Sequence, residues 1–90
     1  MASNDAKSSI SFCSEHLRAG RALLQWSQKT LAEKSNVSLA TIKRLEPIPG
    51  QLSANTVTIS ALKQTLEQAG VIFIQDNEGG PGARLASAVS

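Results

Sequence analysis

Apolar residues recur every three or four positions along most of the chain, which indicates several short amphipathic helices. Leu17 and Leu24 have this spacing and predict a first helix over residues 13–24, with Ser14 as its N-terminal cap. Gly20 lies inside this helix, where glycine costs about 1 kcal/mol relative to alanine. A close helix crossing at Gly20 would offset that cost.

Two further helix starts share one local pattern. Ser27 is a good N-cap, Trp26 precedes it and Leu31 follows four positions later, the spacing of a hydrophobic staple. The same three positions recur eleven residues later, at Val37, Ser38 and Ile42. This interval leaves room for only two turns of helix and a tight corner. Asn36 is the natural corner residue because asparagine tolerates the left-handed conformation. Trp26 is predicted to be a core residue.

The third and fourth helices have clear ends. Pro47 lacks an amide hydrogen and disfavours helix in the preceding residue, so the third helix should stop near Glu46. A loop follows, and a fourth helix is expected from residue 55 or 56 to residue 69. Gly70 suits the C-terminal stop of that helix.

The last part of the chain has the character of a β-structure. Residues 71–74 are β-branched or aromatic and too few for a helix, so they predict a strand, with a possible return strand at residues 83–86. Residues 1–11 are polar and Ser-rich and predict a disordered arm, and residues 87–90 predict a frayed tail. The predicted fold class is mainly α: a four-helix domain over residues 12–70, followed by a C-terminal strand or hairpin over residues 71–86.

Composition limits the interpretation to one small domain with an aliphatic core. The chain has 90 residues, of which 41% are hydrophobic and 3% aromatic, and its net charge is +2. The single cysteine, Cys13, has no intrachain partner for a disulfide, which favours a reducing compartment. No apolar run approaches the roughly 20 residues of a membrane span, and no signal peptide is recognisable. We therefore expect a cytoplasmic protein without membrane attachment.

Positive charge is concentrated in the first half of the chain. Between residues 14 and 46 three acids, Glu15, Glu33 and Glu46, face six cations. These are Arg18, Arg21, Lys29, Lys34, Lys43 and Arg44. From Pro47 onward the acids outnumber the cations. The basic segment coincides with the two stapled helices.

No set of residues suggests an enzyme, a metal site or a cofactor. Cys13 and His16 lie three residues apart, but a metal site needs more ligands than two. Asp76 and Glu78, with the glycines that follow, have the pattern of a turn. The run GGPG lacks the lysine and the following helix of a phosphate-binding loop.

The run WSQKTLAEKSNVSLATIKRLE resembles the DNA-binding domain of Xre/Cro-type bacterial and phage repressors. The resemblance covers about residues 17–70, and the tail GVIFIQDNEGGPGARL is similar to the ending of a small bacterial subgroup of these regulators. Its motifs are Ser27-Gln28, Leu31-Ala32, the corner Asn36-Val37, Ser38 with Thr41-Ile42, and Arg44-Leu45-Glu46. The family usually has glycine at the corner, where this chain has Asn36. The resemblance implies a phage-repressor-like helix-turn-helix fold.

The resemblance also implies roles for individual residues. The base-reading residues would lie on the third helix and are Leu39, Ala40, Thr41 and Arg44. Thr41 and Arg44 share a face of that helix, and Arg44 can bind guanine in bidentate fashion. The residues expected at backbone phosphates, or positioning the helices there, are Ser27, Gln28, Lys29, Ser38 and Lys43. An ion pair between Arg21 and Glu46 would tie the first helix to the end of the third.

Two functions remain open on the sequence alone. The leading hypothesis is a dimeric transcriptional regulator, most simply a repressor, that reads a palindrome in double-stranded DNA. Its dimer contact would be the strand Val71, Ile72, Phe73 and Ile74, either by strand addition or by packing of its apolar face. The alternative is a protein-binding module such as an antitoxin or antiactivator. Residues 47–53, which lack the cations with which many family members grip phosphate, and the apolar pair Leu39-Ala40 are compatible with this alternative.

Overall fold

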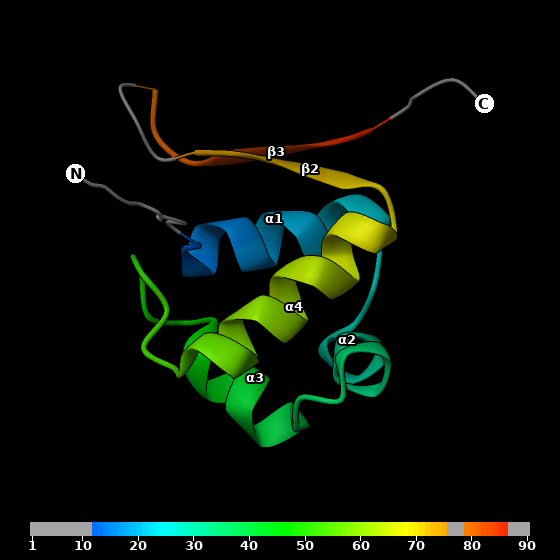
Figure 1. Cartoon of the computed structure of the whole chain (residues 1–90), viewed down its shortest axis with the longest axis vertical. Coiled ribbons are helices and arrows are strands. Elements are labelled where there is room, and N and C mark those ends of the chain that lie inside the picture. The colour runs from blue at the N-terminus through cyan, green and yellow to red at the C-terminus, as the bar shows by residue number, and fades with distance from the viewer. Residues whose placement is uncertain (1–11, 76–78, 87–90) are drawn as a thin grey trace.

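Four helices and a two-stranded hairpin make up the described part of the chain, which covers residues 12–75 and 79–86 in a computed structural model (Figure 1). The helices are α1 (Ser14–Leu24), α2 (Gln28–Ser35), α3 (Leu39–Leu45) and α4 (Thr56–Gln68). The strands are β2 (Val71–Ile74) and β3 (Gly82–Leu85), which pair antiparallel. The predicted class, mainly α with a C-terminal hairpin, is confirmed at this level. The predicted arm (1–11) and tail (87–90) lie outside the described residues.

Of the three predicted helix caps, those at Ser27 and Ser38 are confirmed, and the structure adds a cap at Asn55. The side chains of Ser27, Ser38 and Asn55 accept hydrogen bonds from the third backbone N–H of α2, α3 and α4. The predicted cap Ser14 is wrong: Cys13 holds the N-cap position, and Ser14 is the first helical residue and is fully buried. The Cys13 N–H instead donates to His16 Nδ1 over 3.1 Å. His16, at the third helical position, therefore makes the reciprocal bond of a capping box, accepting from the N–H of the N-cap residue.

Residues with left-handed backbone stand where α1, α2 and α4 end. Asn36 ends α2 with φ 62°, as its sequence position predicts, and Gly70 follows α4 with φ 111°. Gln25 ends α1 with φ 58°, a corner that the sequence did not indicate. Its N–H bonds the Ala22 carbonyl, so the last turn of α1 is closed by backbone alone.

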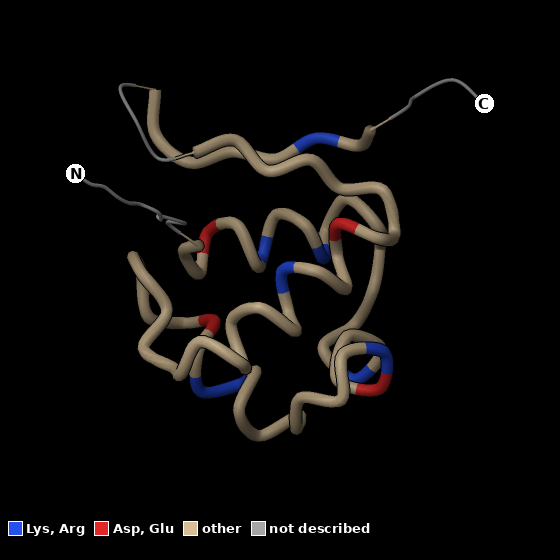
Figure 2. Tube along the Cα trace, in the orientation of Figure 1, with Lys and Arg blue, Asp and Glu red and all other residues tan. Residues whose placement is uncertain are grey.

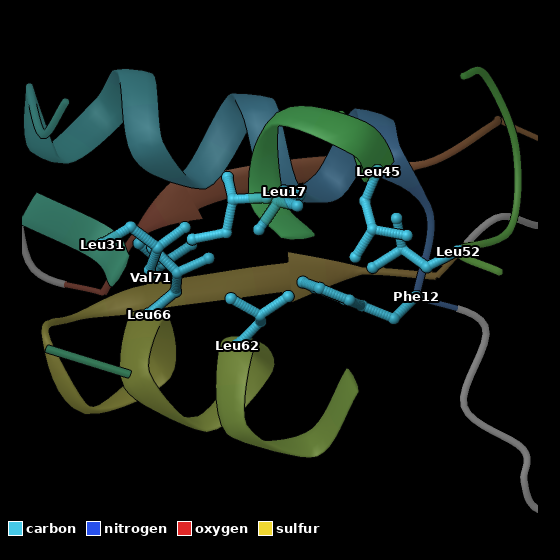
Figure 3. Close-up of a cluster of buried hydrophobic side chains, with 9 residues drawn as sticks. Phe12, Leu17, Leu31, Leu45, Leu52, Leu62, Leu66 and Val71 are labelled. Atoms are coloured by element: carbon cyan, nitrogen blue, oxygen red, sulfur yellow. The ribbon is translucent and has the colours of Figure 1, made fainter. Parts of the chain in front are cut away.

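An aliphatic core lies between α1, α4 and the α2–α3 pair (Figure 3). Its buried members share an exposure of 7% or less and are Phe12, Leu17, Leu31, Ile42, Leu45, Leu52, Leu62, Leu66 and Val71. Trp26 and Val37 pack against this cluster, so both predicted staples end in the core. The prediction of Trp26 as a core residue is confirmed.

The hairpin closes the core over α1. Val71 is buried and Phe73 packs against the core, whereas Ile72 and Ile74 are exposed, so the strand alternates between its faces. Gly20 explains why the hairpin can lie so close: a Cβ there would lie 3.1 Å from Phe73 Cζ and 3.2 Å from Leu66 Cδ1. The structure therefore supplies a close approach at Gly20, the kind of contact that would offset its cost in a helix, and it involves the strand as well as a helix.

The loop between α3 and α4 is tied back to the start of α1. Gly50 N–H donates to Glu15 Oε1 over 3.1 Å, and Ser14 N–H donates to the Gly50 carbonyl over 2.8 Å. Hydrogen bonds from the backbone N–H groups of Glu15 and Gly50 hold the pKa of the Glu15 carboxyl below its ordinary value.

In the part of the chain that the structure describes, no helix is long and apolar enough to cross a membrane.

Filling the space at Gly20 should cost stability. Gly20→Val would force its methyl groups against Phe73 and Leu66, so we expect a loss of about 1–3 kcal/mol in the free energy of unfolding. Ala22→Val is the matched control, because Ala22 is exposed on the same helix and loses only helix propensity. Urea unfolding of both variants measures the difference. Equal stabilities would contradict the close contact.

Candidate nucleic-acid interface

A buried carboxylate joins three helices at the centre of the candidate interface. Glu46, at the end of α3, is only 3% exposed. Arg21 of α1 binds it in bidentate fashion, with Nε 2.8 Å from Oε2 and Nη2 2.8 Å from Oε1. The structure thus brings together the two residues that the family resemblance pairs. Hydrogen bonding to Glu46 raises the pKa of Arg21, which stays charged throughout the accessible pH range.

Gln28, at the start of α2, completes this cluster. Its Nε2 donates to Glu46 Oε1 over 2.9 Å. Gln28 is expected at a DNA phosphate, and in the structure one of the two hydrogens of its side-chain amide bonds Glu46. Arg21 also donates from Nη1 to the Trp26 carbonyl over 3.0 Å, and Arg18 donates to the Glu46 carbonyl. The start of α2 and the end of α3 are therefore held in a fixed relation to α1.

The sequence contained a signal for this second role of Gln28. A carboxylate has about four acceptor positions, and one bidentate arginine fills two of them. A buried Glu46 therefore needed a further donor, and only the fold could show that Gln28 supplies it.

The serine caps of α2 and α3 use their hydroxyl groups within the protein. Ser27 Oγ accepts from Thr30 N–H and donates to Thr30 Oγ1, each over 3.0 Å. Ser38 Oγ accepts from Thr41 N–H over 3.1 Å and donates to Thr41 Oγ1 over 2.8 Å. Both serines were predicted as caps with positioning contacts to DNA. Each serine thus bonds a threonine three residues later, and the backbone N–H groups of the first helical turn are further donors beside it.

The predicted base-reading residues differ in exposure. Ala40 and Arg44 are exposed, while Leu39 and Thr41 are half-buried on α3. Lys43 on the same helix and Lys29 on α2 are also exposed. These six side chains come from two adjacent helices, α2 and α3, at the end of the molecule away from the hairpin (Figure 1).

Lysine and arginine outnumber acids on α2 and α3 (Figure 2). Of the four acids in residues 12–75 and 79–86, three bind a cation: Glu15 pairs with Arg18, Glu46 with Arg21 and Glu67 with Lys63. Glu33 has no such partner. Among the residues that the structure describes, no acid forms an ion pair with the cations of α2 and α3, which are Lys29, Lys34, Lys43 and Arg44. The positive charge of these two helices is therefore available to an anionic partner.

A groove of about 450 Å³ opens between α2 and the start of α3. Its lining residues are Lys29, Ala32, Glu33, Asn36, Val37, Ser38 and Leu39. Most of the lining surface is apolar. Because the groove runs beside the first turn of α3, it belongs to the same surface as the predicted base-reading residues.

The residues expected at a dimer contact divide between two environments. Val71 and Phe73 contribute to the monomer core, and only Ile72 and Ile74 present side chains outward, with exposures of 36% and 43%. The alternation of the strand, which four consecutive apolar residues do not reveal, produces this division.

No metal centre is found among the described residues, which hold no group of three or more His, Cys, Asp or Glu suited to a metal ion. His16 is 1% exposed, and its Nε2 lies 2.6 Å from the Ile74 carbonyl oxygen while Nδ1 accepts from Cys13. Nδ1 thus closes the start of α1, and Nε2 fastens the hairpin to that helix. The chain matches no model of a known protein family and no curated protein.

Removing the arginine from the buried pair should destabilise the fold. Arg21→Ala leaves the Glu46 carboxylate buried with Gln28 as its remaining side-chain donor, so we expect a loss of about 3 kcal/mol. Lys63→Ala is the control, because the Lys63–Glu67 pair lies on the surface of one helix and should be worth under about 1 kcal/mol. Thermal and urea unfolding measure both. A melting temperature unchanged by Arg21→Ala would contradict the central role of this pair.

Proposed function

We propose that this protein is a cytoplasmic, sequence-specific double-stranded DNA-binding regulator with a phage-repressor-like helix-turn-helix. In this proposal α3 enters the major groove and α2 lies across the DNA backbone. The simplest regulatory outcome is repression by occupying a promoter.

One observation carries the proposal: two short, capped helices present four cations that pair with no acid in the described part of the chain, while a buried carboxylate fixes the mutual orientation of the helices. The cations Lys29, Lys34, Lys43 and Arg44 match the phosphate backbone in charge. The bonds from Arg21 and Gln28 to Glu46 keep α2 and α3 in one geometry, so little ordering is needed on binding. The exposed guanidinium of Arg44 is suited to the O6 and N7 atoms of guanine.

Protein binding is the second candidate function, and it has its own supporting observation. Ile48 and Val57, in and after the loop between α3 and α4, are 58% and 77% exposed. Residues 47–53 carry no charge that would hold a phosphate. An uncharged loop with an exposed isoleucine suits a protein surface better than DNA.

Homodimerisation belongs to the proposal, and the position of the hairpin limits its form. The hairpin and α3 lie at opposite ends of the molecule, whose longest dimension is 39 Å (Figure 1). Half-sites of a compact palindrome are about 34 Å apart. Two copies joined through Ile72 and Ile74 would carry their α3 helices on the outer ends, farther apart than this. A hairpin-joined dimer therefore suits widely separated half-sites, or two DNA segments, better than adjacent major grooves.

Arg44→Ala should abolish sequence-specific DNA binding and leave the melting temperature nearly unchanged, because Arg44 is exposed and makes no ion pair. Arg84→Ala is the matched control: Arg84 is also exposed but lies in the hairpin. Mobility shifts on the DNA upstream of the gene, at several salt concentrations, measure both variants. Affinity should fall steeply with salt for the unaltered protein. A folded protein that shifts no DNA, yet co-purifies with another protein, would favour the second candidate function.

Lysine at either exposed position of β2 should disrupt a hairpin-joined dimer. We expect Ile72→Lys and Ile74→Lys to sediment as monomers and to keep their fold, since both side chains point away from the core. Val57→Lys, at an exposed apolar position on α4, is the control. Analytical ultracentrifugation decides the question. Dimers that survive both hairpin substitutions would place the contact elsewhere.

A further inference from the structure

One side of the molecule is formed by the loop between α3 and α4 and by the start of α4, and we call residues 47–57 the uncharged side. Figure 1 shows this segment along the edge opposite α2. It lies within the longest run of the sequence without Asp, Glu, Lys or Arg, residues 47–62, and it is free of charged positions in Figure 2. Among the described residues, the two most exposed large apolar side chains both belong to it: Val57 at 77% and Ile48 at 58%.

Hydrogen bonds and a buried anchor hold the uncharged side in one conformation. The Gly50 N–H donates to Glu15, and the Leu52 N–H donates to the Phe12 carbonyl over 3.3 Å. The Leu52 side chain is buried in the core, and Asn55 caps the start of α4. A surface that is already ordered loses little conformational entropy when a partner binds to it.

The lack of charge on the uncharged side indicates the kind of partner. A phosphate backbone is bound by cations, and residues 47–57 contain none. In a two-fold symmetric contact each surface meets its own copy, so a charge near the axis would meet a like charge. An uncharged apolar side avoids this repulsion, whereas α2 and α3 both carry cations. The uncharged side is therefore suited to a second copy of this chain.

The dimensions of the molecule show what such a contact does for DNA binding. A two-fold axis along the uncharged side, parallel to the long axis of Figure 1, leaves both α3 helices at the same end of the pair. The molecule measures 34 Å across this view, so the centres of two copies in side contact lie about that far apart. Half-sites one helical turn apart are separated by about 34 Å. Copies side by side thus match adjacent half-sites of one duplex.

The contact is too small to hold two copies together in solution. The uncharged side covers only part of a flank that measures 39 by 20 Å. Stable complexes bury about 800 Å² on each partner. On DNA the second copy is already at a high effective concentration beside the first, so a small contact is enough.

We infer that the uncharged side is the contact between two copies bound at adjacent half-sites of one duplex, and that this contact makes their binding cooperative. Ile48 and Val57 of each copy pack against the same side of the neighbouring copy. This inference rests on the proposed DNA binding. The contact is separate from the hairpin surface of Ile72 and Ile74, which lies at the other end of the molecule from α3.

The experiment measures cooperativity with the whole chain on designed duplexes. Duplexes that bind are first selected from a randomised pool, and the tightest half-site is then placed once, or twice as an inverted repeat. The two half-sites are centred about 10 or about 15 base pairs apart, so that the second faces the same or the opposite side of the duplex. At the shorter spacing we expect the second half-site to raise affinity about tenfold beyond independent binding. At the longer spacing we expect no gain.

Substitutions assign the gain to the uncharged side. Val57→Lys places like charges in the contact and Ile48→Ser removes an apolar side chain, so both should lose the gain while still binding a single half-site. Gln68→Lys is the matched control, because it adds the same charge at an exposed position at the other end of α4 and should keep the gain. Ile74→Lys, in the hairpin, should also keep it. Circular dichroism checks that every variant folds.

The possible results separate the inference from the function beneath it. If no duplex is selected from the pool, the proposed DNA binding is wrong, and the inference is overturned with it. If duplexes are selected but a second half-site brings no gain, or the same gain at both spacings, DNA binding stands and the side contact is overturned. A gain that survives Val57→Lys and Ile48→Ser, or that Ile74→Lys removes, overturns it as well. Loss of the gain in the two variants of the uncharged side alone supports the inference.

Discussion

The carboxylate of Glu46 is the point on which the arrangement of the helices depends. A buried carboxylate without partners would be strongly destabilising, so the fold must bring donors to it. Arg21 comes from α1 and Gln28 from α2, while Glu46 itself ends α3. Three elements that are separate in sequence are thus positioned by one charged group. The relative orientation of the exposed surfaces of α2 and α3 therefore depends on this buried contact.

This arrangement separates buried core residues from exposed cations within a short segment. Leu31, Ile42 and Leu45 face the core, and Lys43 and Arg44 face solvent. The helices are only eight and seven residues long, too short to be stable alone in water. The capping serines, the hydrophobic staples and the hydrogen bonds to Glu46 stabilise these two short helices in the folded protein. A rigid pair of short helices is what a reader of DNA needs, because ordering on binding would reduce affinity.

The hairpin shows the limit of reasoning from a run of apolar residues. Four consecutive apolar residues suggested a surface for a second copy, yet Val71 and Phe73 complete the core. Gly20 makes room for Phe73, and His16 binds the Ile74 carbonyl, so the strand is fastened to α1 from two sides. The hairpin is therefore first a part of the monomer, and only Ile72 and Ile74 are left for a partner.

Local features of the sequence determined where the helices and strands lie. The tertiary structure decided which residues of different helices and strands contact one another. Caps at Ser27 and Ser38, the corner at Asn36 and the strand at residues 71–74 depend on neighbours within a few positions, so they were predictable. The second donor to Glu46 and the cap at Cys13 depend on contacts that no local pattern contains. The groove beside Leu39 likewise exists only once α2 and α3 are packed together, because its walls come from both helices.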